Sequence, residues 1–575
     1  MNAFVTYLKP RLRAVIIVAV LVLGIYALVA SNRAGQEKLE EALGSPQMGV
    51  RDAAVQGLVQ NGRLIDTLIS TQNPDEEKDS LQNQRSLTLR KNAAESVNRL
   101  MAANKITTAQ SLDTLFLLCK DGDLKDTAET GLATLGGQSE ANLKQLAARL
   151  SNGDPDVRGA AVDVLGKIGG TNSAITANSV LATPAAQDSA ISALQKIGAP
   201  SVPLIVAHLE DPAAASNIAF RQQMVGLLDQ ISSPQSIPLL TALADKSDQP
   251  SVQRLAQVAL ADTVLSVYNA AQSAKDAVGK AQDAQAKAKD AAARTIAQKA
   301  LSDAQAAQIK AEAAVPGVSG AEPMLTTVLE NLNADGEARA QAALALGRFA
   351  DARAVASLIT ALGDFDSRVQ DAAVQGVQSA GSAAVGPLTA ALNTGEAGAR
   401  AAAAQALGGI GTPAAASALS ESVADPATPV LVREGAITGL GRSGNVAVIP
   451  VLVRALGDKD GTVATAAADG LLTPALEKDA IPALVAAFAQ STPVPFNASD
   501  TLSRMGALTT SEVVPALTQA ISSGSVQTQV WSAVTLGTIG TKDARVLAAL
   551  ARLSASADPQ VQYAASQAQL KLSGA

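Results

Sequence analysis

The sequence predicts an all-α solenoid of about fifteen stacked helical pairs, and three observations support this fold class. A helix-forming pattern recurs along almost the whole chain. A second apolar run, often opened by proline, follows many of its copies. Apolar residues make up 47% of the chain but aromatic residues only 2%. The core therefore consists of Ala, Leu, Val and Ile, whose small side chains let helices pack closely.

One copy of the pattern, residues 153–170, carries every signal of a capped amphipathic helix. Its apolar residues follow the spacing of one helix face. Asp154 can accept hydrogen bonds from first-turn amides, and Pro155 suits the first helical position. Gly169 or Gly170 can end the helix in a left-handed conformation. A helix of about 13 residues needs a partner that covers its apolar stripe, because it is marginal alone in water.

Each copy has an equivalent of Ala161, and we name this position the slot. Neighbouring slots lie 29 to 39 residues apart, except for a gap of 86 residues between Ala256 and Ala342. That gap therefore contains an insertion. The fifteen slots are Ala54, Ala93, Ala128, Ala161, Ala190, Met224, Ala256, Ala342, Ala373, Ala403, Ala436, Ala467, Thr501, Ser532 and Ala565.

The apolar run between slots predicts the second helix of each pair, and in five repeats it opens with proline. Proline is tolerated in a first turn, where its missing N–H has no partner, and it stops the preceding helix from continuing. Each repeat is then a helix, a short turn and a helix. The five prolines are Pro203, Pro238, Pro450, Pro482 and Pro515.

This repeat resembles HEAT repeats, most closely the short, Ala-rich subtype called phycobilisome-lyase-type HEAT-like repeats. The resemblance implies a right-handed α-solenoid that binds proteins. Some relatives of the subtype attach or remove bilin chromophores, but this chain has no second domain for that task, so a bilin-lyase-like protein ranks below a scaffold. Around the slot Ala161, the matching residues are Asp154, Val157, Arg158, Leu165 and Gly166.

Residues 1–35 differ from the repeats and predict an N-terminal signal anchor. Residues 14–30 form a run of seventeen residues without a charge. Seventeen residues are the lower limit of length for a helix that spans a bilayer. The apolar core is longer than that of a cleaved signal peptide, so we favour an anchor. Three basic residues precede the span and two follow it among acidic residues. This bias predicts a cytoplasmic N-terminus and an extracytoplasmic, periplasmic solenoid in the cytoplasmic membrane.

Residues 262–322 form the insertion between seven repeats in 36–261 and eight in 323–575. Ala, Lys, Gln and Asp dominate it, and this composition predicts a long, largely solvated helix or a helical hairpin. It is either a spacer or a projecting coiled coil that meets a partner or a second copy, although sustained heptads of Leu or Ile are absent. Its larger apolar residues between 275 and 314 are Val278, Ile296, Leu301 and Ile309.

The chain lacks the residues that common catalytic and metal sites need. With His208 as its one histidine and Cys119 as its one cysteine, zinc sites and Ser-His-Asp triads are almost excluded. We expect His208 on the surface near a helix end and Cys119 as a buried small apolar residue. Residues 439–444 match G-x-G-x-x-G, but a repeat helix precedes them and their glycines are expected to form its C-terminal turn. We predict no enzyme activity, no cofactor, and no catalytic, cofactor-binding or metal-binding residue.

Eight repeats carry a basic residue three positions before the slot. A basic stripe would suit nucleic acid, whereas nearby acidic residues, such as Asp154 before Arg158, favour ion-pair ladders between repeats. The net charge of −7 and the 12 aromatic residues, 7 Phe, 4 Tyr and 1 Trp, offer little attraction or stacking to nucleic acid. We therefore expect ladders and no nucleic-acid partner. The basic residues are Arg51, Arg90, Lys125, Arg158, Arg221, Arg339, Arg400 and Arg433.

Five aromatic residues in the later repeats are candidates for binding hot spots. We expect Trp531, beside the slot Ser532, to fill the core, and Phe496, after a two-proline loop, to be exposed. The predicted function is a membrane-anchored scaffold or adaptor for protein partners, with the bilayer contacted through residues 14–30. The alternative is a structural envelope component that self-associates through residues 262–322. The five candidates are Phe349, Phe365, Phe496, Trp531 and Tyr563.

Overall fold

The chain was analysed as a computed structural model, which describes residues 33–60, 63–70, 81–103, 105–106, 108–508 and 510–573. These ranges contain helices and no strand, so the prediction of an all-α fold is confirmed. The predicted anchor at 14–30 lies outside the described residues. Within the described ranges, every helix is too short or too polar to cross a bilayer. The chain divides into two compact units, residues 1–236 and 237–575, which are described in turn.

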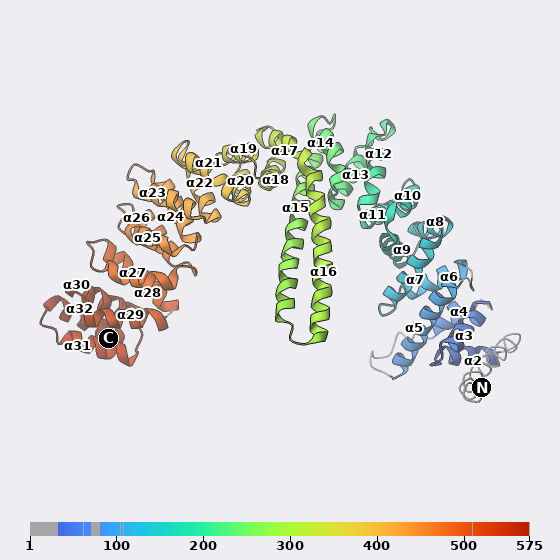
Figure 1. Cartoon of the computed structure of the whole chain (residues 1–575), viewed down its shortest axis with the longest axis horizontal. Helices are drawn as coiled ribbons and strands as arrows, with labels where there is room; N and C mark the ends of the chain where they lie inside the picture. Colours follow the sequence, from blue (N-terminus) through green and yellow to red (C-terminus); the bar gives the residue numbers. More distant parts are fainter. Residues whose placement is uncertain are drawn as a thin grey trace, which may run out of the picture. The chain divides into compact units, whose positions relative to one another are not determined.

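In the first unit, helices alternate between two layers (Figure 1). The slot helices form one layer, in which each packs on the next: α3 (Met48–Gln60), α5 (Leu81–Ala102), α7 (Lys125–Gln138), α9 (Pro155–Ile168), α11 (Gln187–Ile197) and α13 (Ile218–Ile231). The companion helices are α2 (Arg33–Leu43), α4 (Leu64–Ser70), α6 (Thr108–Leu118), α8 (Glu140–Ala148), α10 (Gly170–Ser179) and α12 (Val202–Glu210). Short 3-10 turns are η1 (Arg149–Ser151), η2 (Ala199–Ser201), η3 (Pro212–Ala214) and η4 (Pro234–Ser236).

The second unit has the same two layers. Its slot helices are α15 (Pro250–Lys287), α18 (Gly336–Leu346), α20 (Ser367–Ala380), α22 (Ala397–Ile410), α24 (Val430–Arg442), α26 (Gly461–Leu471), α28 (Val494–Leu508), α30 (Val526–Ile539) and α32 (Pro559–Ser573). Its companion helices are α14 (Ile237–Asp245), α17 (Glu322–Glu330), α19 (Ala352–Ala361), α21 (Ser382–Asn393), α23 (Pro413–Ala424), α25 (Ile449–Ala455), α27 (Glu477–Ala487), α29 (Thr510–Ser523) and α31 (Ala544–Ser554). The turn η6 (Val446–Val448) precedes α25.

The slot is a fully buried position in every repeat. All fifteen slot residues lie on slot helices, and each has a relative exposure of 0%. A slot residue faces neighbouring slot helices and its companion at once, which leaves room for a small side chain and explains why twelve of the fifteen are Ala. The recurring pattern therefore marks the central contact of every helical pair.

Local signals place the ends of α9 where the sequence predicts them. Asp154 accepts a hydrogen bond from the N–H of Asp156 (2.9 Å), and Pro155 is the first helical residue. Gly169 and Gly170 both have positive φ, 61° and 74°. Because a left-handed backbone suits glycine, these two residues end α9 and start α10 without strain.

The proline prediction holds for three companion helices and is wrong for two. Pro203, Pro238 and Pro450 are the second residues of α12, α14 and α25. Pro482 and Pro515, in contrast, lie inside α27 and α29. A separate 3-10 turn precedes α12 and α25, whereas in α27 and α29 the residues before the proline are themselves α-helical and extend the helix. Each internal proline then leaves one carbonyl without its N–H donor.

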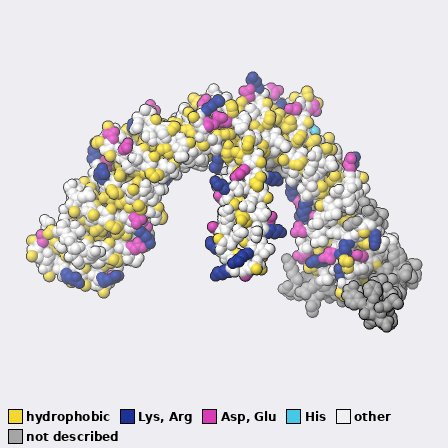
Figure 2. All heavy atoms as spheres, viewed as in Figure 1, with side chains coloured by type: hydrophobic (Ala, Val, Ile, Leu, Met, Phe, Trp, Pro, Cys, Tyr) yellow, Lys and Arg dark blue, Asp and Glu magenta, His cyan; other side chains and the backbone are white. Residues whose placement is uncertain are grey.

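The insertion is a helical hairpin. α15 continues through the boundary predicted at residue 262, because no Gly or Pro occurs between Pro250 and Gly279. α16 (Ala291–Ala314) returns along α15, and η5 (Val315–Ala321) leads to α17 (Figure 1). Ala297 is the one buried residue of α16, so the two arms meet through small side chains. Lys and Arg side chains lie along the hairpin and at its tip (Figure 2).

Candidate interaction surface

The basic residue three positions before the slot stabilises the loop that precedes its helix. In the repeat of α9, the predicted ion pair between Arg158 and Asp154 is wrong. The guanidinium of Arg158 donates to the carbonyl oxygens of Asn152 (2.7 Å) and Gly153 (3.1 Å). Asp154, the expected partner, forms an ion pair with Lys120 of the preceding repeat. Arg158 lies in the first turn of its helix, within reach of loop carbonyls that have no helical donor, and it satisfies them.

Four residues of this set do form the expected links between repeats: Arg90 pairs with Asp121, Lys125 with Asp163, and Arg339 and Arg433 are the two buried cases. Arg433 contacts Asp458 (Nη2 to Oδ1, 3.0 Å) and donates to the carbonyl oxygen of Thr428 (2.7 Å). Arg339 pairs with Asp364 in the same way. In both cases the acidic residue lies 25 positions further on, in the loop before the next slot helix. Both arginines are buried, so these side chains are structural and are not available to a polyanion.

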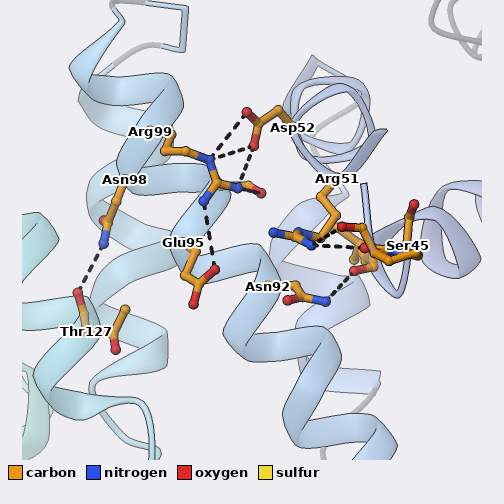
Figure 3. A network of polar contacts seen from close by, with 11 residues as sticks. Ser45, Arg51, Asp52, Asn92, Glu95, Asn98, Arg99 and Thr127 are labelled. Carbon is orange, nitrogen blue, oxygen red and sulfur yellow. Dashed lines mark hydrogen bonds and ion pairs between the residues drawn. The ribbon is translucent and has the colours of Figure 1, made fainter. Parts of the chain in front are cut away.

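A second polar ladder connects slot helices in the first unit, and sequence reasoning missed it. Arg99 of α5 contacts Asp52 of α3 (Nη2 to Oδ1, 2.8 Å) and Glu95 one turn away (3.8 Å), as Figure 3 shows. Asn98 donates to the carbonyl oxygen of Thr127 (3.2 Å), which continues the ladder to the next repeat. The sequence feature that marks this ladder is an Arg or Lys six positions after the slot.

The same register continues through α7, α9 and α11. Lys167, six positions after its slot, pairs with Glu129, and Lys196 pairs with Asp163. Lys125 of α7 also contacts Asp163 (3.0 Å). Burial opposes ionisation of Asp163, but hydrogen bonds from Lys196 and Lys125 outweigh it and hold its pKa below the usual range. The carboxylate therefore acts as a charged link between three repeats.

Cys119 lies beside this ladder and is buried, as the sequence predicts. Burial raises the pKa of its thiol to about 12, and the negative charge of Glu129 adds to the shift. The thiolate is the reactive form of cysteine, so this thiol is inert at neutral pH. His208 is half-buried near the end of α12, where its Nε2 forms a hydrogen bond with Asn178 Oδ1 (2.9 Å).

Slot helices of the second unit touch through glycine instead. A Cβ added to Gly408 would lie 2.1 Å from the Cα of Gly439, and one added to Gly441 would lie 2.7 Å from the Cα of Gly470. Gly439 and Gly441 lie in the last turn of α24, which ends at Arg442, so the prediction that the glycines of 439–444 belong to the C-terminal turn is confirmed. Their close contact with neighbouring helices was not predicted. Both lie within α24, where they admit the backbone of the neighbouring helix, and only Gly444 has a positive φ, 63°.

Large apolar side chains are exposed along one edge of the second unit. They lie in the loop before a slot helix or in its first turn, at α18, α20, α24, α28 and α30. Since slot helices pack side by side, these starts lie along one stack, with α22 and α26 between them contributing no large exposed apolar residue. We name the set the apolar edge; its members and exposed fractions are Leu332 (62%), Phe365 (75%), Leu431 (49%), Phe496 (61%) and Val526 (43%).

Two aromatic side chains form a pair at this edge. The rings of Phe496 and Trp531 meet edge to face, with centroids 6.3 Å apart, and the predicted exposure of Phe496 is confirmed. Trp531 is half-buried, so its predicted place in the core is wrong. It precedes the slot Ser532 by one residue, and a helical step of about 100° turns it from the buried face to the rim. Phe365 covers the guanidinium of Arg339, 4.7 Å from the ring centroid.

The remaining aromatic candidates lie elsewhere. Phe349 is half-buried against Tyr268, with ring centroids 5.8 Å apart, and Tyr563 is exposed on α32. In the described part of the chain, no three His, Cys, Asp or Glu side chains are placed to hold a metal ion.

Paired helices stacked in two layers define each unit as an α-solenoid. Residues 322–396 and 358–431 match the family model of HEAT repeats. Residues 322–431 of the second unit therefore contain HEAT repeats, the repeat type that the sequence resembles.

Several solved structures are similar to the chain. Importin beta is 14% identical, over 94% of this chain and 85% of that one, with a TM-score of 0.28. Human deoxyhypusine hydroxylase is 18% identical, over 44% of this chain and 96% of that one, with a TM-score of 0.20. The CpcE–CpcF complex of phycocyanin lyase from Nostoc is 20% identical, over 44% and 94%, with a TM-score of 0.21. No curated protein sequence matches the chain.

Proposed function

We propose that the protein is a membrane-anchored HEAT-repeat scaffold that binds protein partners and has no catalytic role. The apolar edge is the observation that carries this proposal. Single exposed apolar residues are common on protein surfaces, but these five all lie 5 to 10 residues before a slot, near the start of a slot helix. Neighbouring slot helices lie about 8–10 Å apart, so Phe496 and Val526, in adjacent repeats, can contact one partner segment. The aromatic pair of Phe496 and Trp531 lies near the C-terminal end of this row, and aromatic side chains are enriched among binding hot spots.

Crosslinking from the edge tests the binding role. Full-length tagged protein with a photoreactive residue in place of Phe365 is isolated from native membranes after irradiation, and its partners are identified by mass spectrometry. We expect a stable partner set that Phe496→Asp removes. Val446→Asp is the matched control, because Val446 is equally exposed, at 51%, but starts η6 away from the edge. Equal recovery of partners from both variants would show that the edge is not the binding surface.

The anchor belongs to the same proposal and rests on the uncharged residues 14–30. A helix of this length suits a bilayer, and the basic residues before it favour a cytoplasmic N-terminus. The solenoid then presents its edge outside the cytoplasmic membrane. Carbonate extraction and protease protection of spheroplasts test this topology: we expect the chain to stay with membranes and its repeats to be cleaved from outside. Protection of the repeats would place them in the cytoplasm.

One observation favours a second candidate, self-association through the hairpin. Ile296 and Ile309 of α16 are 71% and 70% exposed, although the hairpin buries little apolar surface of its own. If the hairpin joins copies, the mass of the protein rises with concentration, and Ile296→Gln with Ile309→Gln returns it to the monomer value. A mass that stays constant supports the scaffold alone.

A further inference from the structure

An open groove of about 600 Å³ lies between the companion helices α29 and α31 of the second unit. Its volume is in the range of small-ligand and peptide sites. The groove stays open because its walls carry small side chains at helical spacing. From α29 the lining residues are Pro515, Thr518, Gln519 and Ser522, and from α31 they are Ala544, Arg545, Ala548, Ala549 and Arg552.

The lining is rich in donors and contains no carboxylate. Arg552 is exposed, and its guanidinium has no hydrogen bond or ion pair with any described residue. Arg545 contacts Asp543 (Nη2 to Oδ2, 2.8 Å), but its side chain is 68% exposed. The pair is bidentate, since Nε also contacts Oδ1 at 3.1 Å, but its exposure to solvent lets a ligand carboxylate compete with Asp543 for the outer face of the guanidinium.

The hydroxyl groups of the other wall already donate to their own helix. Thr518 Oγ1 donates to the carbonyl oxygen of Val514 (3.0 Å), and Ser522 Oγ donates to that of Thr518 (3.2 Å). The side-chain amide of Gln519 makes no hydrogen bond to a described residue and can bind a peptide carbonyl. The unpaired groups of the groove are therefore the Arg552 guanidinium and the Gln519 amide, and Arg545 adds a second, exposed guanidinium that is paired with Asp543. Together they suit a chain that carries acceptors and negative charge.

The spacing of the two arginines indicates the conformation of that chain. Arg545 and Arg552 are seven residues apart on α31, about 10.5 Å along the helix at a rise of 1.5 Å. In a polyproline II segment, residues three apart point to the same side and lie about 9.3 Å apart. Acidic residues at every third position of an extended segment thus match the two guanidinium groups.

We propose that the groove between α29 and α31 binds an extended acidic segment of a partner protein, with carboxylates three residues apart on Arg545 and Arg552. The backbone of the segment passes over Ala544 and Ala548, close to the amide of Gln519. This surface lies in the companion layer, whereas the apolar edge lies at the starts of slot helices. The groove therefore goes beyond the binding role proposed above and can fail independently of it.

Fluorescence anisotropy with a defined probe tests the proposal. The full-length chain, in neutral detergent at low salt, is titrated into a fluorescein-labelled, C-terminally amidated nine-residue peptide of three Glu-Pro-Ala units. We expect saturable binding that weakens as salt rises, and affinities at least about tenfold lower for the matching Gln-Pro-Ala and Lys-Pro-Ala peptides. Equal binding of all three peptides would overturn the proposal.

Variants of the protein locate the binding. We expect Arg552→Glu to lower the affinity for the acidic peptide at least about tenfold. Ala548→Phe, which fills the groove without a change of charge, should lower it to the same extent. Arg442→Glu is the matched control, since Arg442 is also exposed but lies in the last turn of α24. Losses as large with Arg442→Glu, or none with Ala548→Phe, would contradict the groove. Phe496→Ala should leave peptide binding unchanged, which separates this result from that of the apolar edge.

Two further probes identify the source of the negative charge. The same peptide with a free C-terminal carboxylate should bind no more than about twofold tighter than the amidated one; binding of the free form alone would mean that the groove holds chain termini. Polyuridylate should bind weakly and without sensitivity to Arg552→Glu. Tighter binding of polyuridylate than of the peptide, lost in that variant, would assign the groove to nucleic acid and refute the proposal.

Discussion

Gly408→Ala is the substitution that most directly tests how the slot helices of the second unit pack. The added Cβ would lie 2.1 Å from the Cα and 2.6 Å from the carbonyl oxygen of Gly439, where ordinary contacts begin near 3.4 Å. α22 and α24 must therefore separate by about 1.3 Å, and they cannot yield by a side-chain rotation. Overpacking of this kind costs up to about 3 kcal/mol, and the better helix propensity of Ala returns up to about 1 kcal/mol. We expect a net loss of about 2 kcal/mol.

Hydrogen exchange is the suitable assay, because stacked repeats open locally and do not unfold as one unit. A loss of about 2 kcal/mol corresponds to about 30-fold faster exchange of the amides in α22 and α24. Gly470→Ala is the matched control: its nearest contact would be the Cα of Gly441 at 3.6 Å, so we expect unchanged or slower exchange in α26. Wild-type exchange in Gly408→Ala, or an equal loss in Gly470→Ala, would refute this account of the packing.

Three further predictions concern the polar contacts. Asp458→Ala leaves buried Arg433 without its carboxylate, and we expect a local loss of about 3–5 kcal/mol, measured by native-state hydrogen exchange in α24 and α26; a loss below about 1 kcal/mol would contradict the ion pair. The pKa of Asp163 is lowered, so its stabilisation is present above the usual carboxyl pKa and is lost as pH falls through the lower, folded value. Exchange protection in α9 and α11, taken relative to the intrinsic amide rate at each pH, should fall on acidification, and Asp163→Asn should flatten this dependence; an unchanged profile would argue against the ladder. Cys119, with its pKa raised to about 12, should resist iodoacetamide at pH 8 until the chain is unfolded, and rapid labelling of native protein would disprove its burial.

The repeat was predictable from sequence because the central contact between its helices admits mainly small side chains. A slot between two helix layers accepts Ala and few other residues, so position and spacing were visible without coordinates. The same holds for the ends of α9, where Asp154 and Gly169 act within one turn of the backbone they satisfy. The anchor at 14–30 stays a prediction, since it lies outside the described residues.

Contacts that depend on the path of a loop were not predictable in this way. The partner of Arg433 lies 25 residues away in the loop before the next slot helix, whereas sequence reasoning looked one turn back. The close contact at Gly408 and Gly439 was not predicted, because the sequence alone does not distinguish a glycine that lets a neighbouring backbone approach from one that ends a helix. Trp531 was predicted to lie in the core, but it precedes the slot by one residue and therefore lies at the rim. The apolar edge could not be recognised until the first residues of the slot helices were known.

The two units differ in how firmly each repeat fixes the next. In the second unit, backbone rests on backbone at Gly408 and Gly439, and such a contact has no rotamers through which to adjust. In the first unit, the ladder of Arg99, Lys167 and Lys196 joins repeats through long side chains that can change length by rotation about their bonds. Under load, we expect the first unit to stretch and twist as an elastic element, while the second keeps a constant pitch and holds its row of apolar contacts in register.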